Sequence, residues 1–87
     1  MTTPVHPRLS AHQFKALDEL CDLVDDGYLY VIGTKHRRMR SFKALERREL
    51  VELVPKHPLR VRIFPTEAGR STLYYYRVRQ FLNKKPA

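Results

Sequence analysis

Two short apolar segments place the strongest constraint on the fold. "LVELV" (50–54) and "LRVRIF" (59–64) flank the sequence "PKHP". In the second segment, apolar residues at 59, 61 and 63 alternate with Arg60 and Arg62, and a period of two is typical of a half-buried strand. Two strands around a short, proline-flanked loop predict a β-hairpin, which Pro65 closes.

Residues 11–25 have the pattern of an amphipathic helix. Ser10 is a good N-cap, and Gln13 completes a capping box three residues later. Apolar residues follow at helical spacing until Gly27 provides a stop. Five acidic residues lie on this helix or directly after it: Asp18, Glu19, Asp22, Asp25 and Asp26. They either keep a solvated face soluble or pair with a basic segment of this chain or of a second copy.

Three further elements complete the expected order. "YLYVI" (28–32) predicts a short strand, and a helix runs to about Arg48 from a start between Lys35 and Ser41. A last helix is expected at 66–83. We therefore predict one α+β domain over 10–83, with a flexible N-terminal arm at 1–9 and a basic tail at 84–87.

The charge balance indicates an acidic partner. The 87 residues include 17 Lys and Arg against 9 Asp and Glu, for a net charge of +8. Nucleic acid is the commonest partner of such an excess. A membrane-surface role is less favoured, because the cations of the last helix are not confined to one side. With Cys21 alone, no long apolar run and no signal peptide, the chain is expected to be cytoplasmic.

The central helix separates its charges from its apolar side chains. On a helical wheel Arg40, Lys43 and Arg47 fall within about 60° of one another, opposite Phe42 and Leu45. Arginine forks suit phosphate oxygens and the edge of guanine. Further cations precede this helix or lie on the hairpin: Arg37, Arg38, Lys56, His57, Arg60 and Arg62. A charged loop beside a charged helix predicts a clamp on a duplex.

This order of elements resembles a winged helix-turn-helix domain. "KALERRELVEL" (43–53) and "FPTEAGR" (64–70) are similar to segments of MarR- and PadR-like regulators. The resemblance implies binding of double-stranded DNA, with the recognition helix in the major groove and the wing on the backbone or minor groove. It implies the following contacts: Arg40, Ser41, Lys43 and Ala44 on bases, Arg47 on the backbone, and Lys56, His57 and Arg60 in the wing.

The chain departs from the family pattern in two places. Only thirteen residues, from Tyr28 to Arg40, are available for a strand and a second helix. That helix is therefore compressed to a single turn at about 35–38, or is absent. Glu49 stands where the family has a glycine, which predicts a weaker end to the recognition helix.

The last helix predicts a homodimer. It needs one apolar face for the domain core, and it carries a second, aromatic face at Tyr74, Val78, Phe81 and Leu82. Its cations lack local acidic partners, so they contact DNA phosphate or the first helix of a partner subunit: Arg70, Arg77, Arg79, Lys84 and Lys85.

Other functions have little support in the sequence. The His and Cys residues lack metal-ligand spacing, and neither a phosphate loop nor a nucleophile motif is present, so no enzyme, metal or cofactor is expected. A chain of this size leaves no room for a sensor domain, and no small-molecule effector is expected. We predict a small transcriptional regulator or a phage or mobile-element accessory protein. The alternatives are a winged-helix module that binds proteins through 74–81, or RNA binding through the same cations.

Overall fold

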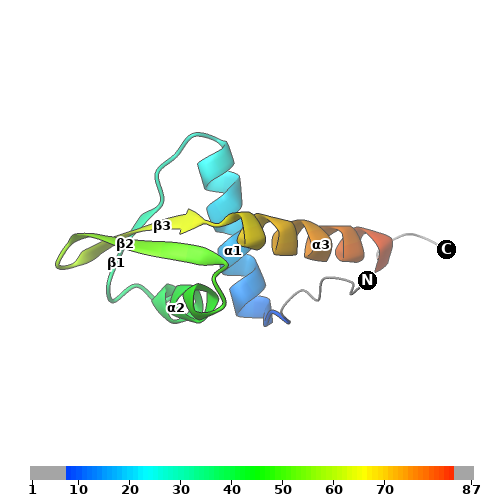
Figure 1. Ribbon diagram of the computed structural model, residues 1–87, viewed down its shortest axis with the longest axis horizontal. Helices are drawn as coiled ribbons and strands as arrows, with labels where there is room; N and C mark the ends of the chain where they lie inside the picture. Colours follow the sequence, from blue (N-terminus) through cyan, green and yellow to red (C-terminus); the bar gives the residue numbers. More distant parts are fainter. Residues whose placement is uncertain (1–7, 84–87) are drawn as a thin grey trace.

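In a computed structural model, the protein consists of helices and a small antiparallel sheet (Figure 1). The structure describes residues 8–83. Along the chain the elements are α1 (Ala11–Asp25), β1 (Val31–Gly33), α2 (Met39–Arg47), β2 (Val51–His57), β3 (Arg60–Pro65) and α3 (Glu67–Asn83). The predicted α+β class is confirmed. Most of the predicted arm and the whole basic tail, with Lys84 and Lys85, lie outside the described residues.

The sheet has the strand order β1-β3-β2, so β3 is central. Both neighbours are antiparallel to β3, and Leu53 is paired with Ile63. The predicted hairpin is confirmed, but its strands continue through most of "PKHP" and the turn lies at 58–59. An irregularity between Pro55 and His57 lets β2 accommodate a proline, which cannot donate to the ladder.

α1 has the expected bounds because both of its ends are capped locally. The Gln13 amide donates to Ser10 Oγ at 3.1 Å, and the Ser10 amide donates to Gln13 Oε1 at 3.1 Å. At the other end the Tyr28 amide donates to the Leu23 carbonyl at 2.9 Å, with Gly27 at a φ of 91°. Tyr28 belongs to this Schellman turn and not to a strand. The strand predicted at 28–32 therefore starts later, and β1 begins at Val31.

No second helix forms ahead of α2 within residues 34–38, which are turns. The His36 amide donates to the Gly33 carbonyl at 3.0 Å, and the Met39 amide donates to the His36 carbonyl at 2.9 Å. Arg38 is the N-cap of α2 without a side-chain cap. The sequence left two alternatives for a second helix, a single helical turn or no helix, and residues 34–38 form no helix.

α2 ends in a second complete Schellman turn. The Leu50 amide donates to the Leu45 carbonyl at 3.0 Å, and the Glu49 amide donates to the Glu46 carbonyl at 2.8 Å. Glu49 has a φ of 62°, in the left-handed region that favours glycine. The prediction of a weaker helix end is therefore wrong in one respect: the hydrogen bonds of the helix end are all formed. They form because Glu49 adopts the left-handed conformation that favours glycine.

The segment "TEAGR" locks α3 to this turn. Thr66 Oγ1 donates to the Glu49 carbonyl at 2.7 Å and accepts the Gly69 amide at 3.0 Å. A Cβ atom at Gly69 would lie 1.9 Å from the Leu50 carbonyl oxygen. The start of α3 thus requires a threonine cap and a residue without a side chain, which gives a physical reason for this short motif.

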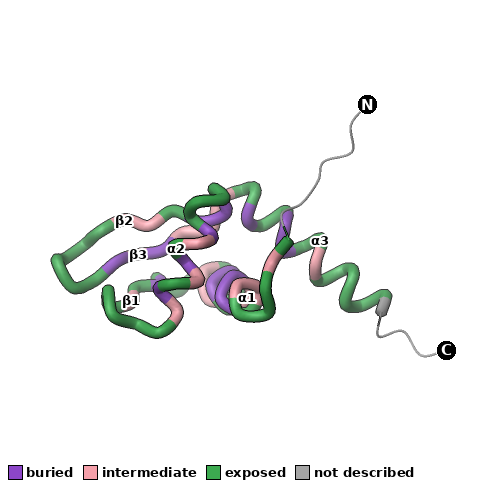
Figure 2. Tube along the Cα trace, turned by 90° about the horizontal axis from the view of Figure 1, so that it is seen from below, coloured by how far each residue is buried: buried purple, intermediate pink, exposed green. Residues whose placement is uncertain are grey.

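The core lies where α1 packs against α2, β3 and α3. Its largest fully buried side chains include Leu17, Leu20, Phe42, Leu45 and Ile63. Tyr30 meets Phe42 edge-on, with ring centroids 5.4 Å apart. α3 is attached to the rest of the domain through the buried Thr72 and Leu73 and through Tyr76, whose ring centroid lies 6.1 Å from that of Phe14, and its last turns project away from the body of the molecule (Figures 1 and 2).

Candidate nucleic-acid interface

The outer face of α2 carries exposed cations over a buried underside. Arg40, Lys43 and Arg47 are exposed, whereas Phe42 and Leu45 are fully buried. Met39 adds a third buried side chain to the underside. The division between the two faces that the sequence predicts is confirmed, and the three cations project from a helix that the core holds in place.

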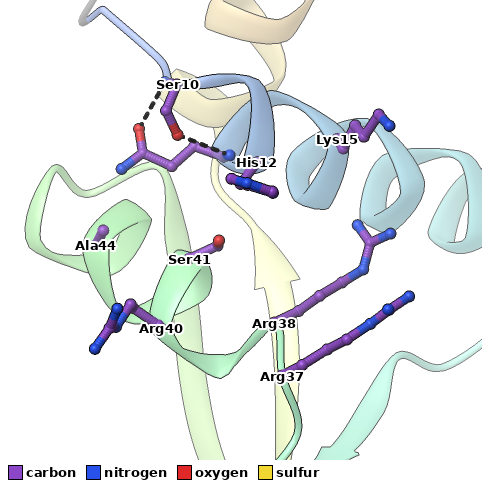
Figure 3. A pocket seen from close by; sticks show the side chains of 9 residues that line it. Ser10, His12, Lys15, Arg37, Arg38, Arg40, Ser41 and Ala44 are labelled. Atoms are coloured by element: carbon purple, nitrogen blue, oxygen red, sulfur yellow. Dashed lines mark hydrogen bonds between the residues drawn. The ribbon is translucent and has the colours of Figure 1, made fainter.

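Ser41 and Ala44 lie on another side of α2. Both are half-buried, and both line a groove between α2 and the start of α1 (Figure 3). They flank Arg40 but do not share the fully exposed face of Lys43 and Arg47. Their predicted role as base-reading positions stays a prediction.

The turn before α2 holds one arginine tightly and leaves another exposed. Arg37 is exposed, whereas Arg38 is half-buried and its guanidinium lies 3.1 Å from a Glu19 carboxylate oxygen. The Arg38 amide also donates to His36 Nδ1 at 3.1 Å. Hydrogen bonds therefore hold the backbone of the turn that carries Arg37 and Arg38.

The β2–β3 hairpin presents a second group of cations. Lys56, His57 and Arg60 are exposed around its turn. His57 Nδ1 accepts the Leu59 amide at 3.3 Å, which fixes this ring beside the turn. Arg62 is half-buried, with its guanidinium carbon 4.3 Å from the centre of the Phe64 ring, a cation–π contact. The hairpin turn and the free end of α3 lie at opposite ends of the molecule (Figure 1).

The acidic residues of α1 pair with cations of the same chain. The Arg77 guanidinium lies 2.8 Å from an Asp22 carboxylate oxygen and also pairs with Asp18, and Arg70 lies 2.6 Å from Asp25. This decides between the alternatives left open by the sequence. For Arg70 and Arg77, the partners are the acids of their own chain, because α3 packs alongside α1.

This pairing leaves the positive charge of α2 and the hairpin uncompensated. Exposed ion pairs contribute only about 0–1 kcal/mol each to stability, so their main consequence here is electrostatic. Within residues 8–83, five exposed cations of α2 and the hairpin form no ion pair: Arg40, Lys43, Arg47, Lys56 and Arg60. The α2–hairpin side therefore keeps an excess of positive charge, although Glu46, Glu49 and Glu52 also lie on it, whereas acids and arginines pair between α1 and α3.

A groove of about 560 Å³ adjoins the cations of α2. Its lining includes His12 and Lys15 of α1, and Arg37, Arg38 and Arg40 on the opposite side. No motif in the sequence places His12 or Lys15 at the site, since they are far from α2 along the chain. Their spacing of three residues on α1 was the only available signal, and it does not specify what the helix faces.

The thiol of Cys21 is not a candidate nucleophile. Its side chain is buried in the core, and burial raises the pKa of the thiol from 9.0 to about 11. A thiol with so high a pKa is almost fully protonated at neutral pH. Residues 8–83 also contain no group of three or more His, Cys, Asp or Glu that could hold a metal ion.

Comparison with models of protein families, with curated proteins and with solved structures found no match to this chain. Among the helices in the described part of the chain, none has both the length and the apolar character needed to cross a bilayer.

Proposed function

We propose that this chain binds double-stranded DNA as a winged helix-turn-helix protein, with α2 as the recognition helix and the β2–β3 hairpin as the wing. One observation carries the proposal. Arg40, Lys43 and Arg47 are exposed on a helix whose other face is buried and form no ion pair within residues 8–83, while acids of α1 pair with other arginines. The biological setting that fits is a small transcriptional regulator or an accessory protein of a phage or mobile element.

The dimensions of α2 suit the major groove. A helix with its side chains is about 10–12 Å across, which a major groove about 12 Å wide admits, and the nine residues of α2 extend about 13 Å along its axis. In this pose Arg40 donates to the O6 and N7 atoms of guanine, and Lys43 and Arg47 extend the contact to bases and phosphates. The cations of the hairpin neutralise neighbouring phosphates, as a wing does. Each neutralised phosphate contributes about −0.9 to the slope of log K against log salt concentration.

The test compares the recognition face with a matched cation elsewhere. Arg40→Ala should weaken binding to a preferred site by about 1–3 kcal/mol and relax the specificity at one base pair. Arg70→Ala, which removes an exposed arginine of α3 whose charge Asp25 already compensates, should leave the affinity nearly unchanged. Fluorescence anisotropy with labelled duplex measures both. The assignment of α2 is wrong if a folded Arg40, Lys43 and Arg47 triple alanine variant binds duplex as the unmodified chain does.

The same titration separates duplex DNA from the other candidate partners. Random duplex DNA, single-stranded DNA and duplex RNA are each titrated at two salt concentrations. The proposal expects the tightest binding for duplex DNA, with a steep salt dependence. Preference for RNA, or salt-insensitive binding of a protein through 74–81, would support the alternative functions instead.

We further propose that two copies associate through the projecting part of α3. Tyr74 and Phe81 are 72% and 75% exposed, and Val78 and Leu82 lie beside them at helical spacing. Arg70 and Arg77 are already paired with acids of α1, so they bring less repulsion to such a contact. A second copy would place two recognition helices on one duplex. Sedimentation equilibrium should detect a dimer, and a monomer at roughly 100 µM, well above micromolar affinity, would contradict the proposal.

A further inference from the structure

The groove between α1 and α2 is lined in part by residues outside both the recognition helix and the wing, among them His12 and Lys15 of α1 and Arg37 of the turn before α2. We propose that this groove binds one phosphate of the DNA backbone, with Lys15 of α1 and Arg37 of the turn before α2 as its principal cations. This inference rests on the proposed function, because the phosphate belongs to a duplex held by α2. It assigns α1 a direct role in binding that the sequence did not suggest.

The groove has the chemistry of an anion site on both of its walls. One wall carries His12 and Lys15, and the other carries Arg37, Arg38 and Arg40. Among the described residues, no acidic side chain lines the groove. Ser41 and His12 face each other across the groove, and the Arg38 side chain extends toward α1 (Figure 3). Hydroxyl, ammonium and guanidinium groups are the donors that phosphate oxygens accept from.

Part of this lining is held in place before any ligand arrives. The Arg38 side chain is only 25% exposed and is paired with Glu19, which lies outside the lining. Hydrogen bonds fix the turn that carries it, including the bond from the Arg38 amide to His36 Nδ1 at 3.1 Å. Since Glu19 already compensates Arg38 and Arg40 belongs to the exposed face of α2, the further uncompensated charge that attracts a phosphate comes from Lys15 and Arg37. Neither forms an ion pair with a described residue.

The groove lies where a helix-turn-helix motif would place the helix that is missing here, and this indicates which backbone phosphate the groove would bind. In a helix-turn-helix motif the first helix crosses the DNA backbone beside the recognition helix. Here residues 34–38 are turns, and α2 instead faces the start of α1 across the groove (Figure 3). Arg40 belongs both to the lining and to the exposed face of α2. A backbone that follows α2 therefore runs past the groove, where Lys15 and Arg37 replace the contact of the missing helix.

The variant Lys15→Ala tests the groove without touching the recognition face. Lys15 is exposed, so its loss should leave the fold intact. We expect affinity for any duplex sequence to fall about 3–10-fold, with the salt slope smaller by about 0.9. Lys15→Arg should retain the affinity, and Arg70→Ala is the control for loss of one exposed arginine whose charge an acid of α1 already compensates. Adding Arg37→Ala should lower the affinity further.

Two outcomes separate this inference from the proposed function. If the α2 triple variant loses duplex binding while the Lys15→Ala, Arg37→Ala variant keeps the affinity and salt slope of the unmodified chain, the groove is not a phosphate site and the proposed function stands. If the unmodified chain binds no duplex, the proposed function fails, and the DNA backbone is excluded as the source of the phosphate.

An NMR titration with inorganic phosphate distinguishes a backbone site from a site for a free anion. The amide signals of His12 and Ser41 should shift only weakly with inorganic phosphate and strongly with duplex, and Lys15→Ala should reduce both shifts. Saturable binding of inorganic phosphate, combined with unchanged duplex affinity in Lys15→Ala, would overturn the proposal in favour of a small-anion site.

Discussion

Replacing Glu49 by glycine should stabilise the protein, because Glu49 has a φ of 62° at the end of α2. A side chain in the left-handed region costs roughly 1–2 kcal/mol. Glycine avoids this cost but gains flexibility in the unfolded chain, which offsets about 0.4–1 kcal/mol. The net gain in the free energy of unfolding is about 0.5–1 kcal/mol, equivalent to about 2–8 °C in Tm for a domain of this size.

The substitution removes no contact that would confuse this result. The Schellman turn uses the backbone amides of Glu49 and Leu50, and Thr66 Oγ1 donates to the Glu49 backbone carbonyl, so glycine keeps all three bonds. The Glu49 side chain is exposed and forms no ion pair within residues 8–83. Glu49→Gly is therefore expected to change the free energy of unfolding through the backbone conformation of residue 49 alone.

Thermal and urea denaturation followed by circular dichroism measure the effect, and two variants control it. Glu49→Gln removes the charge without relieving the backbone, so its Tm should stay near that of the unmodified chain. Gly27→Ala is the reverse change in the equivalent turn of α1, where φ is 91° and no atom lies within 4 Å of an added Cβ. It should lower stability by about 1 kcal/mol. An equal rise in Tm for Glu49→Gln and Glu49→Gly would refute the backbone argument.

Two further substitutions test the packing of α3 and its proposed contact with a second copy. Gly69→Ala should destabilise the fold by about 3 kcal/mol, the upper end of the usual range for overpacking, since its Cβ would lie 1.9 Å from the Leu50 carbonyl oxygen. Urea denaturation measures this, with the exposed Ser71→Ala as a control, and a loss below about 1 kcal/mol would contradict it. Phe81→Asp should shift the sedimentation equilibrium toward monomer by at least about tenfold in Kd, as expected when a charge enters an apolar contact. An unchanged equilibrium would place the interface elsewhere.

The elements that sequence analysis predicted best are those specified by neighbours in the chain. Ser10 and Gln13 cap α1 from three residues apart, and Gly27 ends it. The buried underside of α2 follows from a repeat of three to four residues. The alternation before Pro65 identified β3. Each signal depends on a helix turn or a strand pleat, whose geometry is the same in every protein.

The position of the hairpin turn and the start of β1 were predicted less well. Pro55 and Lys56 belong to β2 because the strand pairing with β3 continues past the proline after a local irregularity. The capping turn of α1 extends to Tyr28 and delays β1. Strand ends depend on which backbone groups find partners on another strand, and a single segment does not contain that information.

The sequence by itself determined the helices, the hairpin, the ordered cations of α2 and the excess of positive charge. Only the tertiary structure decided where that charge is left uncompensated. Arg77 pairs with Asp18 across 59 positions of sequence, and Lys15 and Arg37 line the same groove. Such contacts depend on how α1 packs against α2 and α3. The physical reason is that local hydrogen bonds and side-chain periodicity act over a few residues, whereas electrostatic pairing acts between whichever surfaces the packed core brings together.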